Sequence, residues 1–158
     1  MIEADVDTML QTTLVGRLGL CCGSQPYVIP INFAYHKGHI YFHCADVGMK
    51  IQYLRNNPIV CFEVDEHIGT IEAPVICNYE TAYRSVVAFG RATILADHEK
   101  KTTALRLIVA KYAGNENAQK LETRTVEKYR SPKGSETVVV DIKIEKVTGK
   151  RYSTEQTS

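Results

Sequence analysis

The chain has 158 residues, which suits one domain that buries its own hydrophobic core over residues 1–158. Lys and Arg together number 19 against 18 Asp and Glu, so no broad field of one sign is available to attract nucleic acid or an anionic membrane. The apolar runs are too short to span a bilayer and the first residues lack the order of a secretion signal, so we expect a cytoplasmic protein.

The first third of the chain predicts a helix followed by three strands. Asp5 or Asp7 can cap the helix, which ends near Thr13. Alternating apolar residues then indicate strands over residues 14–20, 27–35 and 40–45. Pro30 lies inside the second of these strands and has no amide hydrogen, so we expect that strand at a sheet edge or at a bulge.

The middle of the chain predicts a second helix, a fourth strand and a loop. Apolar residues fall at helical spacing over residues 47–56, where Asp46 can cap the helix and Pro58 prevents its continuation. An apolar run then indicates a strand over residues 59–64. Residues 65–82 mix polar residues with Gly and Pro and show no period, so we expect a long loop there.

The last part predicts two strands that flank two helices. A long apolar strand covers residues 85–96, where Gly90 indicates a bulge or a bend. Asp97 can cap the next helix, which Gly114 ends. The core stripe of this helix is Leu105, Ile108, Val109 and Tyr112; a more polar helix over residues 115–129 and a strand over residues 136–152 follow. About six strands in hairpin order favour a closed or partly split antiparallel barrel over a parallel sheet.

Five cysteines lie at positions 21, 22, 44, 61 and 77, mostly inside predicted strands. An odd number in such segments favours reduced, buried thiols. The spacing of paired zinc ligands is missing, because the adjacent Cys21 and Cys22 would point to opposite faces of a strand. We therefore expect no metal site.

Two segments contain residues that suit a phosphate group. In residues 41–50 a strand leads into a helix whose first turn contains a glycine and Lys50, and helix amides together with a lysine can hold a phosphate. A solvated lysine on a helix surface explains the same pattern. At the start of the strand in residues 83–92, Arg84 and Ser85 can also bind a phosphate, or Arg84 can form a surface ion pair.

Three segments together have the order and spacing of a known family, namely residues 26–33, 41–50 and 83–92. With them the chain resembles the FMN-binding split barrels of the pyridoxamine 5′-phosphate oxidase-like superfamily, in particular the nitroimidazole-resistance (Nim-like) branch. The resemblance extends from about Thr13 to Tyr112. It implies a mainly β protein with helices, built as a six-stranded antiparallel Greek-key split β-barrel.

The resemblance also implies a set of FMN-binding residues, namely Pro30, Ile31, Asn32, Phe33, His43, Met49, Lys50, Tyr83, Arg84 and Ser85. Residues 30–33 would follow the edge of the isoalloxazine ring with backbone groups, and the phosphate would rest on Lys50. Arg84 and Ser85 would complete the phosphate or ribityl site, from the other subunit of a homodimer that holds the flavin at its interface. FMN combines a flat apolar ring with a dianionic phosphate, so it needs a dry slot next to concentrated positive charge.

His43 is the one candidate for a catalytic residue. It can relay a proton or form a hydrogen bond with the ring or the substrate, because its charge changes near neutral pH. A core histidine bonded to a backbone carbonyl is the alternative. Arg17 and Arg55 are either further cations of the site or ordinary surface residues.

The resemblance implies an FMN-dependent oxidoreductase that takes electrons from NAD(P)H and reduces a small acceptor such as a nitro-aromatic or a quinone. No Rossmann-type glycine fingerprint is present, so the nucleotide would visit an open face of the flavin. A non-catalytic flavin-binding or sensing protein, or a split barrel that binds haem or deazaflavin, are the alternatives. Oxidation of pyridoxamine 5′-phosphate itself is not expected, because the arginine-rich strand and the C-terminal substrate segment of those oxidases have no clear match.

Overall fold

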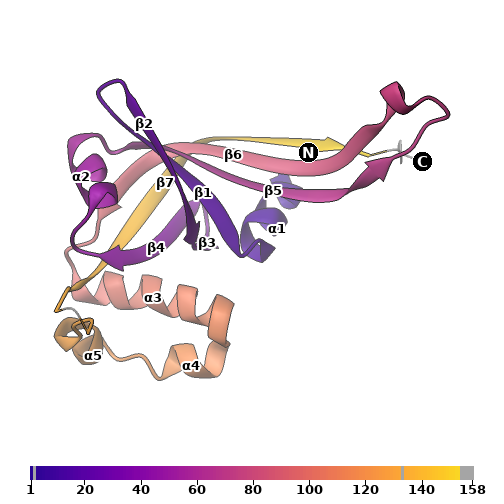
Figure 1. The fold of residues 1–158 in the computed structure, drawn as a ribbon. Coiled ribbons are helices and arrows are strands. Elements are labelled where there is room, and N and C mark those ends of the chain that lie inside the picture. Colours follow the sequence, from indigo (N-terminus) through magenta and orange to yellow (C-terminus); the bar gives the residue numbers. More distant parts are fainter. Residues whose placement is uncertain (2, 133, 154–158) are drawn as a thin grey trace.

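A computed structural model describes residues 1, 3–132 and 134–153. Its strands are β1 (Val15–Cys22), β2 (Gln25–Asn32), β3 (Ala34–His36), β4 (His39–Ala45), β5 (Ile59–Ile71), β6 (Glu80–Ile94) and β7 (Thr137–Tyr152). Its helices are α1 (Glu3–Thr12), α2 (Met49–Asn56), α3 (His98–Ala113), α4 (Asn115–Gln119), α5 (Thr123–Lys128) and the short 3₁₀ helix η1 (Ile76–Asn78). In Figure 1 helices α3, α4 and α5 lie together on one side of the sheet, and α2 lies near β2 and the end of β4.

The strands form one antiparallel sheet in the order β2-β1-β5-β6-β7-β4-β3. The two end strands, β2 and β3, are consecutive in the chain and are separated only by Phe33. The sheet must therefore curl until its two ends meet, which makes it a split barrel. The described residues contain seven strands rather than the expected six, because the single strand predicted over residues 27–35 changes its partner from β1 to β4 at Phe33.

Helix α3 supplies the hydrogen bonds that the interrupted strand lacks at this point. The backbone N–H of Phe33 donates to the hydroxyl oxygen of Tyr112 at 2.9 Å, and that hydroxyl lies 3.1 Å from the carbonyl oxygen of Phe33 and also contacts the carbonyl of Leu14. The amine of Lys111 lies 3.7 Å from the centroid of the Phe33 ring, and burial lowers the pKa of this amine to about 8. The end of α3 thus holds the seam of the barrel.

The hydrophobic core fills the inside of the curled sheet. Phe33 and Phe62 pack edge to face with their ring centroids 4.7 Å apart, and both side chains are fully buried. Gly16 lies so close to this pair that a Cβ there would be 2.1 Å from the Phe62 ring. The other fully buried side chains of the core include Leu18, Ile40, Phe42, Val64, Val86, Val140 and Ile142. Because the aromatic pair lies directly at the seam, closing the barrel and forming the core are one event.

Several local predictions are confirmed. Pro30 lies in β2, at the edge of the strand order, where its missing amide hydrogen costs nothing. The pairing of β6 with β7 shifts between Phe89 and Gly90, as a bulge requires. Asp97 caps α3 by accepting a hydrogen bond of 2.8 Å from the N–H of Lys100.

The long loop predicted over residues 65–82 is wrong. Strand β5 continues to Ile71 and β6 begins at Glu80, and their hairpin extends from the barrel as an arm (Figure 1). Most side chains of this arm are exposed, so its sequence lacks the alternation that a half-buried strand shows. A register shift between His67 and Gly69 disturbs the pattern further.

Three predictions about caps and helices are also wrong. Asp5 and Asp7 lie inside α1, where Asp7 accepts a hydrogen bond of 2.5 Å from the hydroxyl of Tyr35. Asp46 does not cap α2, whose first flanking residue is Gly48 with no side-chain hydrogen bond. The predicted helix over residues 115–129 is two short helices, and the carbonyl of Leu121 between them accepts hydrogen bonds from Arg106.

The cysteines are less buried than expected. Cys77 is exposed and the other four are half-buried. No helix in the described ranges has the length and the apolar character needed to cross a membrane.

The seam of the barrel leads to a stability prediction. Tyr112→Phe removes the acceptor that the described residues offer to the N–H of Phe33, so the free energy of unfolding should fall by about 1–3 kcal/mol in urea denaturation. Tyr79→Phe is the matched control, because Tyr79 is exposed in the loop of the arm, and its effect should stay within about 0.5 kcal/mol. Equal stability of the two variants would show that the Tyr112 hydroxyl does not hold the seam.

Candidate functional site

One cavity of about 500 Å³ brings together residues from four elements of the fold. It is lined by Val15 of β1, by Pro30, Ile31 and Asn32 of β2, by His43 of β4 and by Lys50 of α2. Five of these six residues were predicted from the sequence as site residues. Figure 1 shows why they meet: the curled sheet brings β2 near the end of β4, where the chain continues into α2.

The start of α2 leaves backbone donors available at this cavity. Gly48 precedes the helix with φ 112°, a conformation that favours glycine, and it offers no side chain that could bind the first amides. The first N–H groups of a helix have no partner inside it and lie at the positive end of its dipole. Lys50 follows within this first turn, so this end of the cavity suits an anion.

Lys50 is the cation in the wall of this cavity, and it has no acidic partner among the described residues. Among the described residues no carboxylate lies within ion-pair distance of its amine, which lies 5.4 Å from the centroid of the Phe42 ring. Partial burial lowers the pKa of His43 below its usual value of 6.5, and the charge of Lys50 lowers it further. At neutral pH His43 is therefore mostly uncharged, and the positive charge of the cavity resides on Lys50.

Asp46 contributes a second unusual feature near the start of α2. Its Oδ1 atom is buried and has no hydrogen-bond partner among the described residues. A buried acceptor without a donor is costly, so such an atom indicates that a donor is supplied from elsewhere.

Two of the predicted site residues near this cavity do not line it. The side chain of Phe33 is fully buried in the core, so only its backbone could contact a ligand. Met49 is exposed at the first position of α2 and is not part of the cavity wall.

Tyr83, Arg84 and Ser85 lie on β6 near the arm, away from Lys50 in the same chain (Figure 1). Arg84 lines a different cavity of about 520 Å³ next to α1, where it forms an ion pair with Glu66. Neighbouring residues of a strand point to opposite faces of the sheet, so the side chains of Arg84 and Ser85 cannot both grip one phosphate on the same face. A single chain therefore separates these three residues from the cavity at α2.

The two other cations that the sequence offered for the site, Arg17 and Arg55, do not line the cavity. Arg17 forms ion pairs with Glu63 and Asp65, which neutralise its charge. Arg55 is exposed in the last turn of α2, at the opposite end of the helix from the cavity.

A second, apolar cavity of about 270 Å³ was missed from the sequence. Its wall includes His43, the α3 residues Leu105, Ile108 and Val109, and Val126 of α5. The sequence pattern identified the α3 residues as a core stripe, because it could not show that α5 leaves a space above them. Val15 was missed as well, since only its pairing with Asn32 brings it to the first cavity.

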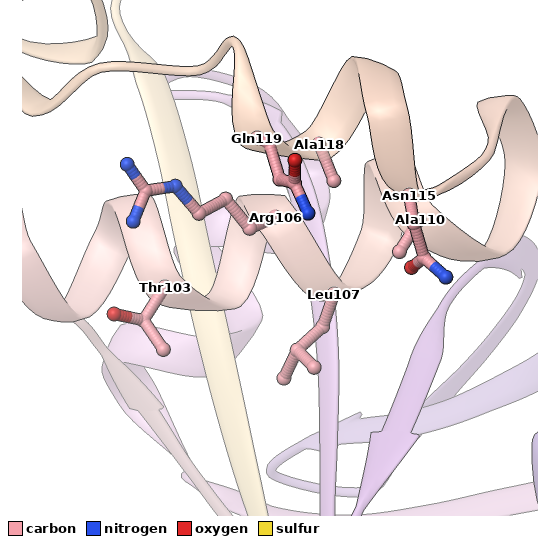
Figure 2. A pocket seen from close by; sticks show the side chains of 7 residues that line it. All are labelled: Thr103, Arg106, Leu107, Ala110, Asn115, Ala118 and Gln119. Carbon is pink, nitrogen blue, oxygen red and sulfur yellow. The ribbon is translucent and has the colours of Figure 1, made fainter.

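A third hollow lies between α3 and α4 and is shown in Figure 2. Arg106 is its only charged lining residue, and both Nε and Nη2 of this side chain donate to the carbonyl of Leu121, at 3.0 and 2.7 Å. These bonds fix the connection between α4 and α5 onto α3. Like the cavity at α2, this hollow is open to solvent, and its cation already has a structural role.

The curled antiparallel sheet, with a cavity between β2, β4 and α2, places the chain in the class of split β-barrel proteins. The model of the pyridoxamine 5′-phosphate oxidase family matches residues 3–151, and the chain belongs to this family. The superfamily expected from the sequence is thereby confirmed.

Solved structures show the same fold. A candidate 5-nitroimidazole antibiotic resistance protein of Bacteroides thetaiotaomicron is 23% identical, with a TM-score of 0.72 over 94% of this chain and 82% of that one. An FAD-binding protein of Mesorhizobium loti is 27% identical, with a TM-score of 0.68 over 97% and 96% of the two chains. The FAD and haem binding protein of Mycobacterium smegmatis is 17% identical, with a TM-score of 0.80 over 96% and 72%.

An uncharacterized protein of Rhizobium meliloti (strain 1021) is 31% identical over 77 residues. This match covers 49% of the chain and 44% of that relative, so the chain spans less than half of the relative's length in the alignment.

The electrostatics of the cavity lead to a titration prediction. The pKa of His43, followed by NMR of its imidazole, should lie below 6.5, and Lys50→Gln should raise it without restoring the full value, because burial is the larger cause. Replacing the exposed Lys146 of β7 by Gln should leave the pKa of His43 unchanged.

The pKa of His43 also predicts a pH dependence of stability. Since the unfolded chain binds the imidazole proton more tightly than the folded one, the contribution of His43 to stability should be present above pH 6.5 and lost as the pH falls through the lower folded pKa. A His43 pKa at or above 6.5 would contradict this description of the cavity.

Proposed function

We propose that the cavity between β2, β4 and α2 binds a flavin, specifically FMN, and that the loaded protein is an oxidoreductase. The phosphate would lie at the start of α2 beside Lys50, and the ring would follow residues 30–32 of β2. The observation that carries the proposal is that one cavity combines an unneutralised lysine at an uncapped helix start with an edge strand on its other side. A dianionic phosphate and a flat ring need these two surroundings.

The edge position of β2 supports the placement of the ring. Within the described residues β2 forms ladder hydrogen bonds with β1 only, so the backbone groups on its other edge remain available to a ligand. Pro30 has no N–H to offer, and neighbouring residues of a strand direct their amides to opposite edges, so one of the two amides of Ile31 and Asn32 can face the ligand, next to carbonyl acceptors. These groups suit the polar edge of an isoalloxazine ring.

The unpartnered oxygen of Asp46 supports the same ligand. The ribityl chain of a flavin carries hydroxyl groups, and a hydroxyl donor would satisfy the buried Oδ1 atom.

A bound flavin would supply two-electron transfer between NAD(P)H and a small acceptor such as a nitro-aromatic or a quinone. For a nitro group the reaction balances as follows: NAD(P)H provides two electrons and one proton, the medium provides one proton, and the products are the oxidised nucleotide, a nitroso group and water. The chain's own residues would hold the ligand, exclude water and place His43 beside the reactants. As an uncharged imidazole, His43 can donate one hydrogen bond and accept another.

We further propose a homodimer, and the outer face of β6 and β7 supports it. Tyr83, Phe89 and Tyr152 share one face of the sheet and are exposed, which suits burial against a second copy. Ser85 lies on that face and is the residue that could reach the partner's cavity. Arg84 points to the other face, where Glu66 already binds it.

All five cysteines are free, which suits a reducing compartment such as the cytoplasm.

The identity of the ligand is tested by the chromophore that copurifies with the protein. We expect flavin absorbance and a mass that matches FMN. A mass that matches FAD, the ligand named for the Mesorhizobium loti protein, would correct the ligand while preserving the flavin site. Bleaching of the absorbance by NADH or NADPH distinguishes an oxidoreductase from a passive binding or sensing protein. A haem spectrum, or a colourless protein that takes up no added flavin, would contradict the proposal.

The phosphate position is tested by a charge-removing variant. Lys50→Gln should raise the Kd for FMN by about 10- to 100-fold in a fluorescence titration, because a charge-assisted hydrogen bond is lost. Arg84→Gln should change the Kd less, since Arg84 is paired with Glu66, and Lys100→Gln on the exposed surface of α3 should leave it unchanged. An unaltered Kd for a folded Lys50→Gln protein would place the phosphate elsewhere.

A further inference from the structure

The apolar cavity between α3 and α5 is separate from the cavity assigned to the flavin, yet the two share one residue. His43 lines both of them. No other residue appears in both walls within the described part of the chain. His43 therefore stands at the boundary between a polar cavity that suits an anion and an apolar cavity that does not.

The chemistry of the apolar wall restricts what it can hold. Its described lining residues are aliphatic, apart from the hydroxyl groups of Thr125, Tyr129 and Thr137 and the imidazole of His43. None of them carries a full charge at neutral pH, since burial and Lys50 lower the pKa of His43. A charged ligand would lose its hydration there without gaining a partner, whereas an uncharged ligand would bury apolar surface.

The size of the cavity suits a small aromatic molecule. A cavity of about 150 Å³ lined by aliphatic and aromatic side chains can hold benzene. The apolar cavity has about 270 Å³, which leaves room for one aromatic ring with substituents.

One wall of the cavity is held in place by a specific clamp. Four lining residues come from α5 and its two flanks, namely Leu121 before the helix, Thr125 and Val126 within it, and Tyr129 directly after it. The guanidinium of Arg106 donates two hydrogen bonds to the carbonyl of Leu121, which fixes this segment against α3. The cavity is thus a built part of the fold rather than a gap between loose segments.

We propose that the apolar cavity between α3 and α5 is the binding site for the electron acceptor, and that it selects small, uncharged, aromatic molecules which contact His43. This inference rests on the proposed function, because the neighbouring cavity must hold the flavin. It adds the location of the acceptor and a selection by charge. The polar group of the acceptor, such as a nitro or quinone oxygen, lies toward His43, and its ring lies among Leu105, Val109 and Val126.

Binding can be measured directly because the chain contains no tryptophan. Tyr129→Trp introduces a single indole into the cavity wall, and Glu127→Trp introduces one at an exposed position of the adjoining helix α5 as a control. Nitrobenzene should quench the first indole saturably in the protein as purified, while the second should show only linear, collisional quenching. The charged analogue 4-nitrobenzoate should quench both linearly. Linear quenching of both variants by nitrobenzene would overturn the inference.

Turnover tests whether the cavity serves the acceptor. In the flavin-loaded protein, Val126→Trp fills the cavity and should raise the KM for nitrobenzene by about tenfold or more, with the rate of flavin reduction by NADPH unchanged. Val126→Phe should give a smaller increase and serves if the larger side chain prevents folding. Glu127→Trp should match the wild type. An unchanged KM in both folded Val126 variants would overturn the acceptor role even if nitrobenzene binds.

The two proposals fail in distinguishable ways. A protein that binds no flavin and is not reduced by NADPH would disprove the proposed function and the acceptor role with it, whatever the indole quenching shows. A flavin-loaded protein that NADPH reduces, but whose indole in the cavity wall shows no saturable quenching, would keep the proposed function and disprove only the acceptor site.

Discussion

The hydrogen bonds between Phe33 and Tyr112 are the constraint on which the rest of the structure depends. The strand that contains Phe33 has to leave β1 and join β4, and the backbone groups at this change need partners that no ladder provides. The Tyr112 hydroxyl supplies them from the end of α3. This contact closes the barrel, brings residues 30–32 beside His43 and Lys50, and attaches to the barrel the helix that carries the apolar cavity.

The distribution of charge explains how a nearly neutral protein can offer an anion site. Arg17 and Arg84 are paired with carboxylates, and Arg106 binds a backbone carbonyl, so these cations serve the fold. Lys50 lacks such a partner among the described residues and lies where a helix begins without a cap. The net charge of +1 is therefore uninformative about ligands, since what matters is where the fold places a cation without an acidic partner, and Lys50 lies in the wall of a cavity.

The sequence predicted those features that depend on the properties of single residues. Pro30 at an edge strand, Gly90 at a bulge and Asp97 at a helix cap each follow from local backbone chemistry. The resemblance to a known family identified the residues that line the cavity on β2, β4 and α2. For Pro30, Gly90 and Asp97 the deciding information lay within a few consecutive residues, whereas the resemblance depended on three segments taken together.

The sequence could not predict features that depend on tertiary pairing. The break at Phe33 is decided by a tyrosine 79 residues later, and the long arm of β5 and β6 has exposed side chains without a periodic pattern. Arg84 was grouped with Lys50 because both can bind a phosphate, yet its strand directs it to Glu66. The apolar cavity lies between α3 and a segment that Arg106 contacts at Leu121, and the residues of α3 alone do not reveal this contact.

The most direct test of the central claim is the response of individual backbone amides to added FMN, measured by ¹H–¹⁵N NMR on the flavin-free protein. We expect the largest shifts at Gly48, Met49 and Lys50 and at Ile31 and Asn32, with Arg84 little affected. Shifts concentrated in the groove around Thr103 and Asn115, or an absence of shifts at the start of α2, would contradict the claim.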